Sequence, residues 1–273
     1  MVDSELKGLL RCSECGFITA NMDSSTEELE SLYSDAYFNG EEYADYLADQ
    51  KMIEKNFRHR LSTLRKVLGI KPDLLKLKSV FEIGCAYGFF LKTAQDVFRQ
   101  AAGIDISKEA TEYAKDVLGV NAYTGDYESF TPSDKVDVIC MWDTIEHLSC
   151  PDKYIEKAYA HLQEDGVICI TTGDISSLNA RIRGEKWRQI HPPTHLHYFS
   201  AKTLHTLLER NGFEVLYTGH PSNYISMNTA LYTLQVKNRW LAGFYNIARA
   251  IGFTKVYVPV NLFDFVYVIA RRV

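Results

Sequence analysis

The stretch SVFEIGCAYG, residues 79–88, decides the fold of this 273-residue chain. Its first five residues form a short apolar run rich in β-forming side chains, which predicts a buried strand. Small residues at Gly84, Ala86 and Gly88 then allow a tight turn and a close approach of the backbone to a ligand. A helical pattern follows over 89–98. A strand, a small-residue turn and a helix in this order indicate an α/β unit.

The same alternation continues on both sides of this stretch. Further strands are expected at 101–106, 121–124, 136–142, 166–172, 213–218 and 265–271. Helices are expected at 46–69, 107–118, 152–162 and 200–211. The run VDVICMW at 136–142 is nearly all apolar, as a strand covered on both faces should be. These elements predict a Rossmann-like, doubly wound α/β sheet.

The domain organisation follows from the same patterns. Residues 1–45 are expected to form an irregular N-terminal cap, and residues 46–273 the main domain. A long insertion, 219–262, precedes the last strand. Its apolar residues recur as a helical stripe made of Met227, Leu231, Leu234, Leu241, Tyr245 and Ala248. The insertion is interpreted as a helical cap on the sheet, with a pocket lid, a dimer surface or a membrane-surface patch as alternatives.

The composition narrows the class of protein. Hydrophobic residues make up 46% and charged residues 24%, as in globular domains, and the net charge of −5 argues against a general nucleic-acid binder. The acidic start lacks a signal-peptide pattern, and no apolar run approaches the ~20 residues that cross a bilayer. The six cysteines show no disulfide-scaffold spacing. We therefore expect a cytoplasmic protein without stable membrane insertion.

Ligands of such sheets bind outside the carboxyl ends of the strands. A nicotinamide fingerprint would need glycines at 84, 86 and 89, but the chain has Ala86 and Phe89, which argues against a nicotinamide oxidoreductase. Asp105, 21 residues after Gly84, ends the second strand and could accept hydrogen bonds from ribose hydroxyls. Asp126 and Tyr127 follow the third strand, where they could hold an adenine ring.

Taken together, the segments EIGCAYG, GIDIS, GDYESF, VDVICMWDTIEHL and GVICITTG resemble class I S-adenosylmethionine-dependent methyltransferases. Within that class they are similar to the group that includes quinone-precursor O-methyltransferases. The resemblance covers about residues 79–218 and implies a seven-stranded, mostly parallel sheet whose last strand is antiparallel. It implies S-adenosyl-L-methionine as cofactor, contacted by Glu82, Gly84, Cys85, Ala86, Gly88, Asp105, Ile106, Asp126, Tyr127 and Trp142. Ala86 departs from the commoner glycine of the family.

Methyl transfer to a hydroxyl needs a base that removes the proton, and histidine suits this task. Glu146 and His147 follow the fourth strand, where the reaction would occur. His195 matches the histidine of the family's Trp…Pro-x-His…Phe-Ser…Gly-Phe stretch. The catalytic candidates are therefore Glu146, His147 and His195, with a purely loop-holding role as the alternative for His195.

Two groups of residues could hold a cation, although the prediction assigns no metal. Asp143, Glu146 and His147 recur at i, i+3 and i+4, and a second group consists of His191, His195 and His197. Separately, Cys12-x-x-Cys15-Gly16 has the form of half a zinc ribbon. Residues 1–45 contain no second pair, so a remnant or a chain whose start has been lost is the preferred interpretation.

The leading hypothesis is a methyltransferase that acts on a small-molecule, lipid or glycan acceptor, with a hydroxyl oxygen as the favoured atom. The alternatives are a C- or N-methyltransferase of a sugar or natural product, and a non-catalytic S-adenosylmethionine-binding protein. The expected partners are the small-molecule acceptor and a second copy of the chain in a homodimer, and no nucleic acid.

Overall fold

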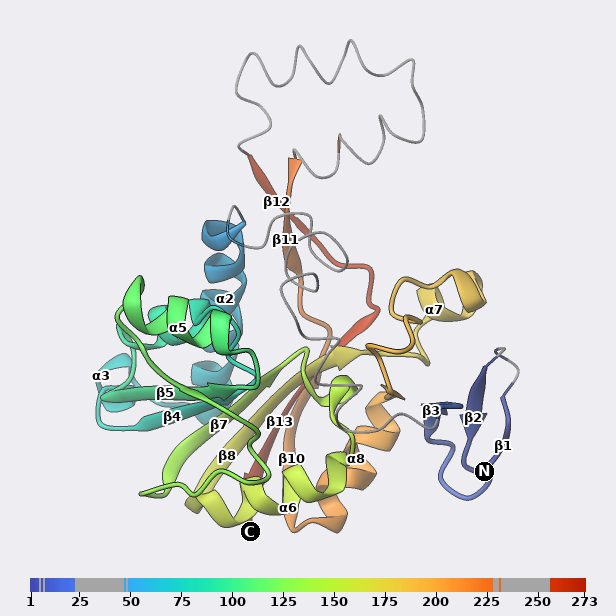
Figure 1. Cartoon of the computed structure of the whole chain (residues 1–273), viewed down its shortest axis with the longest axis horizontal. Helices are drawn as coiled ribbons and strands as arrows, with labels where there is room; N and C mark the ends of the chain where they lie inside the picture. Colours follow the sequence, from blue (N-terminus) through green and yellow to red (C-terminus); the bar gives the residue numbers. More distant parts are fainter. Residues whose placement is uncertain (5, 7, 23–46, 48, 228–230, 232–255) are drawn as a thin grey trace.

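A seven-stranded sheet forms the centre of the computed structural model, which describes residues 1–4, 6, 8–22, 47, 49–227, 231 and 256–273 (Figure 1). The strand order is β10-β13-β8-β7-β4-β5-β6. The strands are β4 (Ser79–Ile83), β5 (Gln100–Asp105), β6 (Asn121–Thr124), β7 (Val136–Trp142), β8 (Leu162–Gly173), β10 (Phe213–Gly219) and β13 (Phe265–Arg272). All neighbours are parallel except β13, which runs antiparallel to both β8 and β10. The predicted fold class is confirmed.

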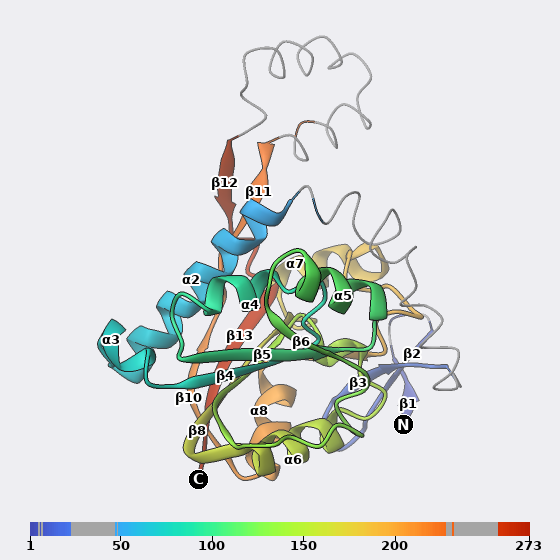
Figure 2. The same ribbon diagram turned by 60° about the vertical axis from the view of Figure 1, so that its left-hand side comes forward.

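Helices cover both faces of the sheet (Figures 1 and 2). One face carries α2 (Gln50–Leu68), α4 (Phe89–Ala94) and α5 (Lys108–Asp116), and the other carries α6 (Pro151–His161) and α8 (Ala201–Arg210). The short helices are α3 (Pro72–Leu75), α7 (Leu178–Arg183) and the 3-10 turns η2 (Ile145–His147) and η3 (Gly184–Lys186). From β4 the chain passes to β5 and β6, which lie on one side of β4 in the sheet, and then crosses to β7 on the other side. The carboxyl ends of β4 and β7 therefore flank the topological switch point.

Strand β7 shows why its sequence is apolar throughout. Val138, Cys140 and Trp142 pack into the core under α2 and α4, whereas Ile139 and Met141 pack into the core under α6 and α8. Side chains alternate between the two faces of a strand, so a strand covered on both faces needs apolar residues at nearly every position. The prediction that this strand is covered on both faces is confirmed.

The N-terminal segment is more ordered than the sequence predicted. Its described residues form β1 (Val2–Asp3), β2 (Leu9–Arg11) and β3 (Ile18–Ala20), and β3 pairs with β9 (His197–Tyr198) to complete a four-stranded sheet. The prediction of an irregular segment was wrong over these residues, because strands of two or three residues are too short to show a period. Residues 23–46 lie outside the described residues, and the division at residue 45 stays a prediction.

The insertion begins and ends in strands. β11 (Asn223–Ser226) pairs antiparallel with β12 (Tyr257–Val260), and the side chain of Asn56 on α2 exchanges two hydrogen bonds with the backbone of Tyr224. These strands were not predicted. The expected helical stripe falls almost entirely on residues 228–255, of which only Leu231 is described.

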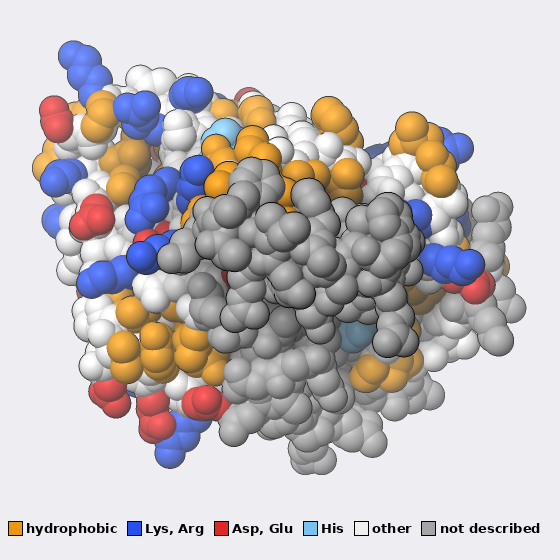
Figure 3. Space-filling view, turned by 90° about the horizontal axis from the view of Figure 1, so that it is seen from above, with side chains coloured by type: hydrophobic (Ala, Val, Ile, Leu, Met, Phe, Trp, Pro, Cys, Tyr) orange, Lys and Arg blue, Asp and Glu red, His pale blue; other side chains and the backbone are white. Residues whose placement is uncertain are grey.

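The described surface is mixed in character. Figure 3 shows basic and acidic side chains close together on the side of α2 and α5, so neither sign forms a large patch there. On α7, Leu178 and Ile182 are 71% and 76% exposed. Among the described residues, none of the helices combines the length and the apolar content needed to span a bilayer.

Candidate active site

The turn after β4 accepts only glycine at two positions. Gly84 has φ +78°, and a Cβ atom there would lie 2.6 Å from the side chain of Thr144, which follows β7. Gly88 has φ +77°, and a Cβ atom there would lie 2.8 Å from the Cβ atom of Ala114 on α5. Both conformations are left-handed, which disfavours other residues. The turn therefore packs closely against Thr144 and α5 at the carboxyl edge of the sheet.

Asp105 ties this turn to the end of β5. Its Oδ2 accepts a hydrogen bond from the backbone N–H of Ala86 at 2.8 Å, and its Oδ1 accepts one from Ser107 at 2.9 Å. Burial raises the pKa of Asp105, and these two bonds oppose the shift. The next residue, Ile106, is 38% exposed, so an apolar side chain is available at the same edge. The predicted ribose contact is therefore made by a residue, Asp105, that also holds the turn 84–88 in place. This turn is called the glycine turn below.

Three buried polar atoms near the ends of β4 and β7 lack a hydrogen-bond partner among the described residues. They are Glu82 Oε2, Arg60 Nε and Trp142 Nε1. The Arg60 guanidinium lies 5.3 Å from the centre of the Trp142 ring and forms a 3.1 Å ion pair with Asp143. Burial and then the charge of Asp105 raise the pKa of Glu82, whereas Arg60 lowers it.

Buried polar groups without partners are rare in folded proteins and point to a missing ligand or water. A zwitterionic amino acid carries an ammonium group for Glu82 and a carboxylate for Arg60 and Trp142. The methionine part of the predicted cofactor therefore fits these residues. Arg60 was not among the residues predicted from the sequence. Its signal was an arginine between Phe57 and Leu64 on the apolar stripe of the predicted helix 46–69.

The predicted adenine contact of Tyr127 is corrected by the structure. This side chain is only 2% exposed, lies within the core against Phe81, and its hydroxyl hydrogen-bonds His161 Nδ1 at 3.0 Å. A ring in this position packs the core and does not face a ligand. Asp126 lies at the sheet edge and accepts a hydrogen bond from the hydroxyl of Tyr154.

The side chain of Cys85 is likewise buried, at 3% exposure. Burial raises the pKa of its thiol. The backbone of Cys85, and not its side chain, is therefore the part that could contact a cofactor at the turn.

A second cluster joins the three catalytic candidates. Glu146 and His147 lie on η2, directly after β7, and His195 comes from the loop that follows α7. One potential ligand atom from each of the three side chains lies within 4.8 Å of the other two. The rings of His147 and His195 are 4.6 Å apart, centre to centre, and nearly perpendicular. The fold therefore brings His195 close to Glu146 and His147, which are adjacent in the sequence.

Backbone carbonyls orient both imidazoles. Nδ1 of His147 lies 2.8 Å from Thr194 O, and Nδ1 of His195 lies 2.8 Å from Gln189 O. Because a carbonyl only accepts, Nδ1 of His195 carries a hydrogen, and Nε2 of its neutral ring carries the lone pair. The lone pair of His195 can then accept a proton.

Burial sets the charge of this cluster. It lowers the pKa of His147 to about 4 and that of His195 to about 3. Burial and the charge of Asp143 raise the pKa of Glu146 to about 8, and Glu146 Oε2 lacks a partner among the described residues. At neutral pH both imidazoles are therefore uncharged, beside a carboxyl group that holds its proton. Shifts of this size in a cluster are typical of functional sites.

The two predicted cation groups are rearranged in the structure. Asp143 pairs with Arg60 and accepts a hydrogen bond from Thr171, whereas His191 contacts Thr194 and His197 contacts Thr19. The donor set that does assemble, one carboxyl group and two imidazoles, has the chemistry that divalent transition metals accept. Cys12 and Cys15 lie in the turn between β2 and β3. They belong to none of the metal-ligand groups found in the described part of the chain.

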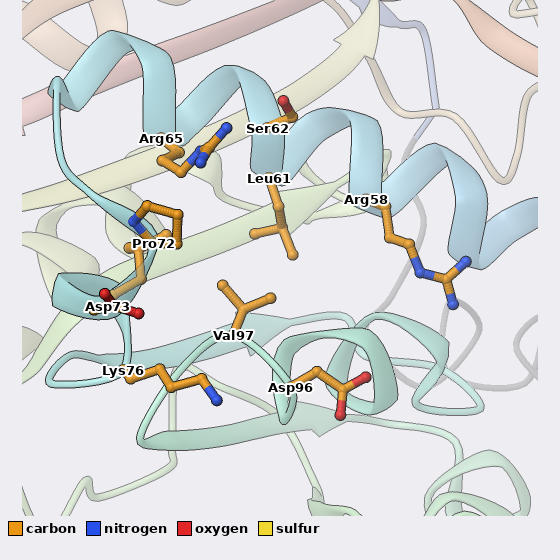
Figure 4. A pocket seen from close by; sticks show the side chains of 10 residues that line it. Arg58, Leu61, Ser62, Arg65, Pro72, Asp73, Lys76, Asp96 and Val97 are labelled. Carbon is orange, nitrogen blue, oxygen red and sulfur yellow. The ribbon is translucent and has the colours of Figure 1, made fainter.

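A separate hollow lies at the opposite, amino end of the strands (Figure 4). Arg58 and Arg65 of α2 face Asp96 and Lys76 across the apolar side chains of Leu61 and Val97. Charges of both signs line it, and none of the orphaned buried atoms of the described chain belongs to its lining. The carboxyl edge, with the glycine turn and the histidine cluster, is therefore the candidate active site.

Comparison with known proteins identifies the family of the chain. A family model described as a methyltransferase domain matches residues 52–218. A ubiquinone biosynthesis O-methyltransferase of Haemophilus ducreyi is 29% identical over 126 residues, which cover 42% of this chain and 53% of that protein. A malonyl-[acyl-carrier protein] O-methyltransferase of Calditerrivibrio nitroreducens is 29% identical over 141 residues, with coverages of 49% and 52%. The chain thus spans about half the length of the curated relatives it matches.

Solved structures show the same fold. The N-methyltransferase NodS of Bradyrhizobium japonicum, in complex with S-adenosyl-L-homocysteine, has a TM-score of 0.54 at 15% identity, covering 92% of this chain and 99% of that one. An S-adenosylmethionine-dependent methyltransferase of Clostridium acetobutylicum has a TM-score of 0.53 at 11% identity, covering 82% and 96%. The predicted enzyme class and cofactor are confirmed by the family match. Because that match extends over more than half of its residues, the chain belongs to the methyltransferase-domain family, with S-adenosylmethionine as cofactor.

Proposed function

We propose that this protein transfers a methyl group from S-adenosylmethionine to a hydroxyl oxygen of a small-molecule, lipid or glycan acceptor, with His195 as the base. The observation that carries the proposal is the position of the histidine cluster beside the glycine turn. Thr144, whose side chain packs against Gly84, lies two residues before Glu146. A proton acceptor therefore lies next to the predicted methyl donor.

When bound, the cofactor supplies a methyl group on a positively charged sulfur. Arg60, Trp142 and Glu82 would hold its amino-acid part, and the glycine turn would allow its close approach. His195 Nε2 would take the proton of the acceptor hydroxyl, so that the oxygen can accept the methyl group. Glu146 balances the charge of the protonated imidazole by passing its own proton to solvent.

The names of the relatives favour oxygen as the acceptor atom, because both curated relatives are O-methyltransferases. The fold by itself is not decisive. NodS is named an N-methyltransferase, and SpnF, a [4+2]-cyclase, has the fold with a TM-score of 0.51 at 20% identity. Carbon or nitrogen methylation and cofactor binding without turnover are therefore the competing outcomes of the tests below.

The first test is titration calorimetry with S-adenosylmethionine and S-adenosylhomocysteine, with NAD as the control. We expect micromolar binding of the first two and no heat with NAD. Absence of binding to both would contradict the proposal. An acceptor screen with methyl-labelled cofactor follows, in which phenols, hydroxylated lipids and sugars compete with amines and carbon acids. Labelled methyl ethers support oxygen transfer, and labelled methylamines or C-methyl products overturn it.

The second test addresses the base. His195→Ala is expected to lower kcat by about 10²–10⁴-fold, the range of general-base catalysis, with cofactor affinity unchanged. His205→Ala is the matched control, because His205 lies on α8 and contacts Thr218. Wild-type turnover in His195→Ala would leave that histidine a loop-holding role. Loss of turnover in His147→Ala alone would move the base to His147.

Three further expectations belong to this proposal. The partners are a small-molecule acceptor and a second copy of the chain, and the site of action is the cytoplasm. Light scattering of the purified protein tests the homodimer, for which we expect about twice the mass of 31.2 kDa. A monomer across the concentration range would contradict it.

A further inference from the structure

We infer that the three N-terminal strands β1–β3, called the hairpin below, are part of the active site of the proposed methyltransferase. In this inference Thr19, on β3, is a residue that positions His195 and Glu146. The inference rests on the proposed function. Its basis is the pairing of β3 with β9, where Thr19 lies opposite His197. β9 has only two residues, Tyr198 being the second, and β3 is its partner in the sheet.

Leu196 is the residue through which the hairpin reaches the cluster. Its carbonyl oxygen accepts two hydrogen bonds, from Ala20 N at 2.8 Å and from Thr19 Oγ1 at 2.9 Å. Its N–H donates to the carbonyl of Glu146 at 2.9 Å. Both lone pairs of the carbonyl are thus used by the hairpin, and the N–H is used by η2. A shift of β3 would therefore be felt at Glu146 through a single residue.

The residues on either side of Leu196 are held in the same way. The carbonyl of His195 accepts a hydrogen bond from the Tyr198 hydroxyl at 3.0 Å. Thr19 Oγ1 donates to the carbonyl of Leu196 and also lies 3.1 Å from Nδ1 of His197. One threonine hydroxyl therefore fixes the backbone at residue 196 and the imidazole at residue 197.

Apolar packing makes this arrangement rigid. Leu9, Ile18 and Tyr198 are 2–4% exposed and form a small core of their own with Ala20. Phe17 packs against the rings of His197 and Phe199 at 5.4 Å and 5.2 Å between ring centres. The hairpin is thus a packed element attached to the loop of His195.

A shift of the hairpin would change the distances between the catalytic candidates. The candidate ligand atoms of Glu146, His147 and His195 lie within 4.8 Å of one another. A misplacement of about 1 Å at such a site can lower the rate by about 10²-fold. Loss of the Thr19 hydroxyl should therefore reduce kcat, whereas the glycine turn and Arg60, which lie on other elements, should still bind the cofactor normally.

The test compares the wild type with Thr19→Val and Thr19→Ser. Valine has nearly the same shape without the hydroxyl, and serine keeps the hydroxyl. We expect Thr19→Val to lower kcat by about 10- to 100-fold, with the KM for S-adenosylmethionine within twofold of the wild type. Amide hydrogen exchange in residues 194–199 should become faster, and Thr19→Ser should restore both quantities. Leu75→Ala, which truncates a buried side chain of α3 outside the hairpin and the histidine cluster, controls for general loss of stability.

Each result bears on the inference. Unchanged kcat in Thr19→Val overturns it, and so does an equal fall in Leu75→Ala and Thr19→Val at matched loss of stability. If the wild type transfers no methyl group to any acceptor, the proposed function fails, and hydrogen exchange still decides the structural part. Exchange in residues 194–199 that is the same in Thr19→Val and the wild type would then overturn the positioning role by itself.

Discussion

Gly84→Ala tests the close packing of the glycine turn. Two costs are expected. An alanine at φ +78° costs about 1–2 kcal/mol, because its Cβ atom is strained in the left-handed region. The new Cβ atom would also lie 2.6 Å from Cγ2 and Oγ1 of Thr144, about 1 Å closer than van der Waals contact allows. Overpacking of this kind costs about 1–3 kcal/mol. The free energy of unfolding should therefore fall by about 2–5 kcal/mol.

Two further variants separate these costs. Gly119 has φ +66°, and a Cβ atom there would have nothing within 4 Å, so Gly119→Ala should show the conformational cost alone, about 1–2 kcal/mol. Thr144→Ala removes Cγ2 and Oγ1 and keeps its own Cβ atom, at 3.2 Å. In that background, the cost of Gly84→Ala should fall toward that of Gly119→Ala.

Urea unfolding measures these differences, and calorimetry measures the affinity for S-adenosylmethionine. Relieving the clash requires a shift of the turn or of Thr144, and both lie at the carboxyl edge of the sheet. We therefore expect at least tenfold weaker binding in Gly84→Ala, equivalent to about 1.4 kcal/mol, and wild-type binding in Gly119→Ala. If Gly84→Ala costs the same as Gly119→Ala and binds the cofactor normally, the close approach of this turn to β7 is refuted.

Three other predictions follow from the buried charges. Arg60→Gln should weaken S-adenosylmethionine binding about tenfold in calorimetry, and unchanged affinity would exclude Arg60 from the cofactor site. Asp105→Asn should lower the unfolding free energy in urea by about 2 kcal/mol, because an amide cannot accept from both Ala86 and Ser107; a neutral effect would contradict this linking role. Burial lowers the pKa of His161 from 6.5 to about 4, so the unfolded chain binds the extra proton between these values and stability is lost as the pH falls. The wild type should therefore lose about 2 kcal/mol between pH 7 and pH 5 relative to His161→Gln, and parallel pH profiles of the two proteins would refute this.

Most of the sheet could be predicted because its signals are local. The apolar run at 136–142 and the alternation of strands and helices give β4–β8, β10 and β13 within a few residues of their observed bounds. Strands β1–β3 and β9 were missed because two or three residues carry no period. Their pairing also depends on contacts between positions such as Thr19 and His197, which are 178 residues apart.

The candidate site was predictable in part for the same reason. Motif spacing places Asp105 at the end of one strand and Glu146 shortly after another, and the structure has Asp105 at the end of β5 and Glu146 on η2 after β7. Tyr127 also follows a strand, but its direction depends on the packing of Phe81 and His161, which the motif does not contain. Arg60 was missed because its partner Asp143 is 83 residues away.

The order of strands and helices, the glycine turn and the family membership follow from the sequence, because they depend on residue periods and on backbone sterics within short segments. The neighbours of each polar side chain were decided by the tertiary structure. His195 joins Glu146 and His147 through the loop after α7, and Thr19 reaches Leu196 across 177 residues. Contacts of this kind require the whole sheet to assemble. The charge of the histidine cluster follows from the burial that this assembly creates.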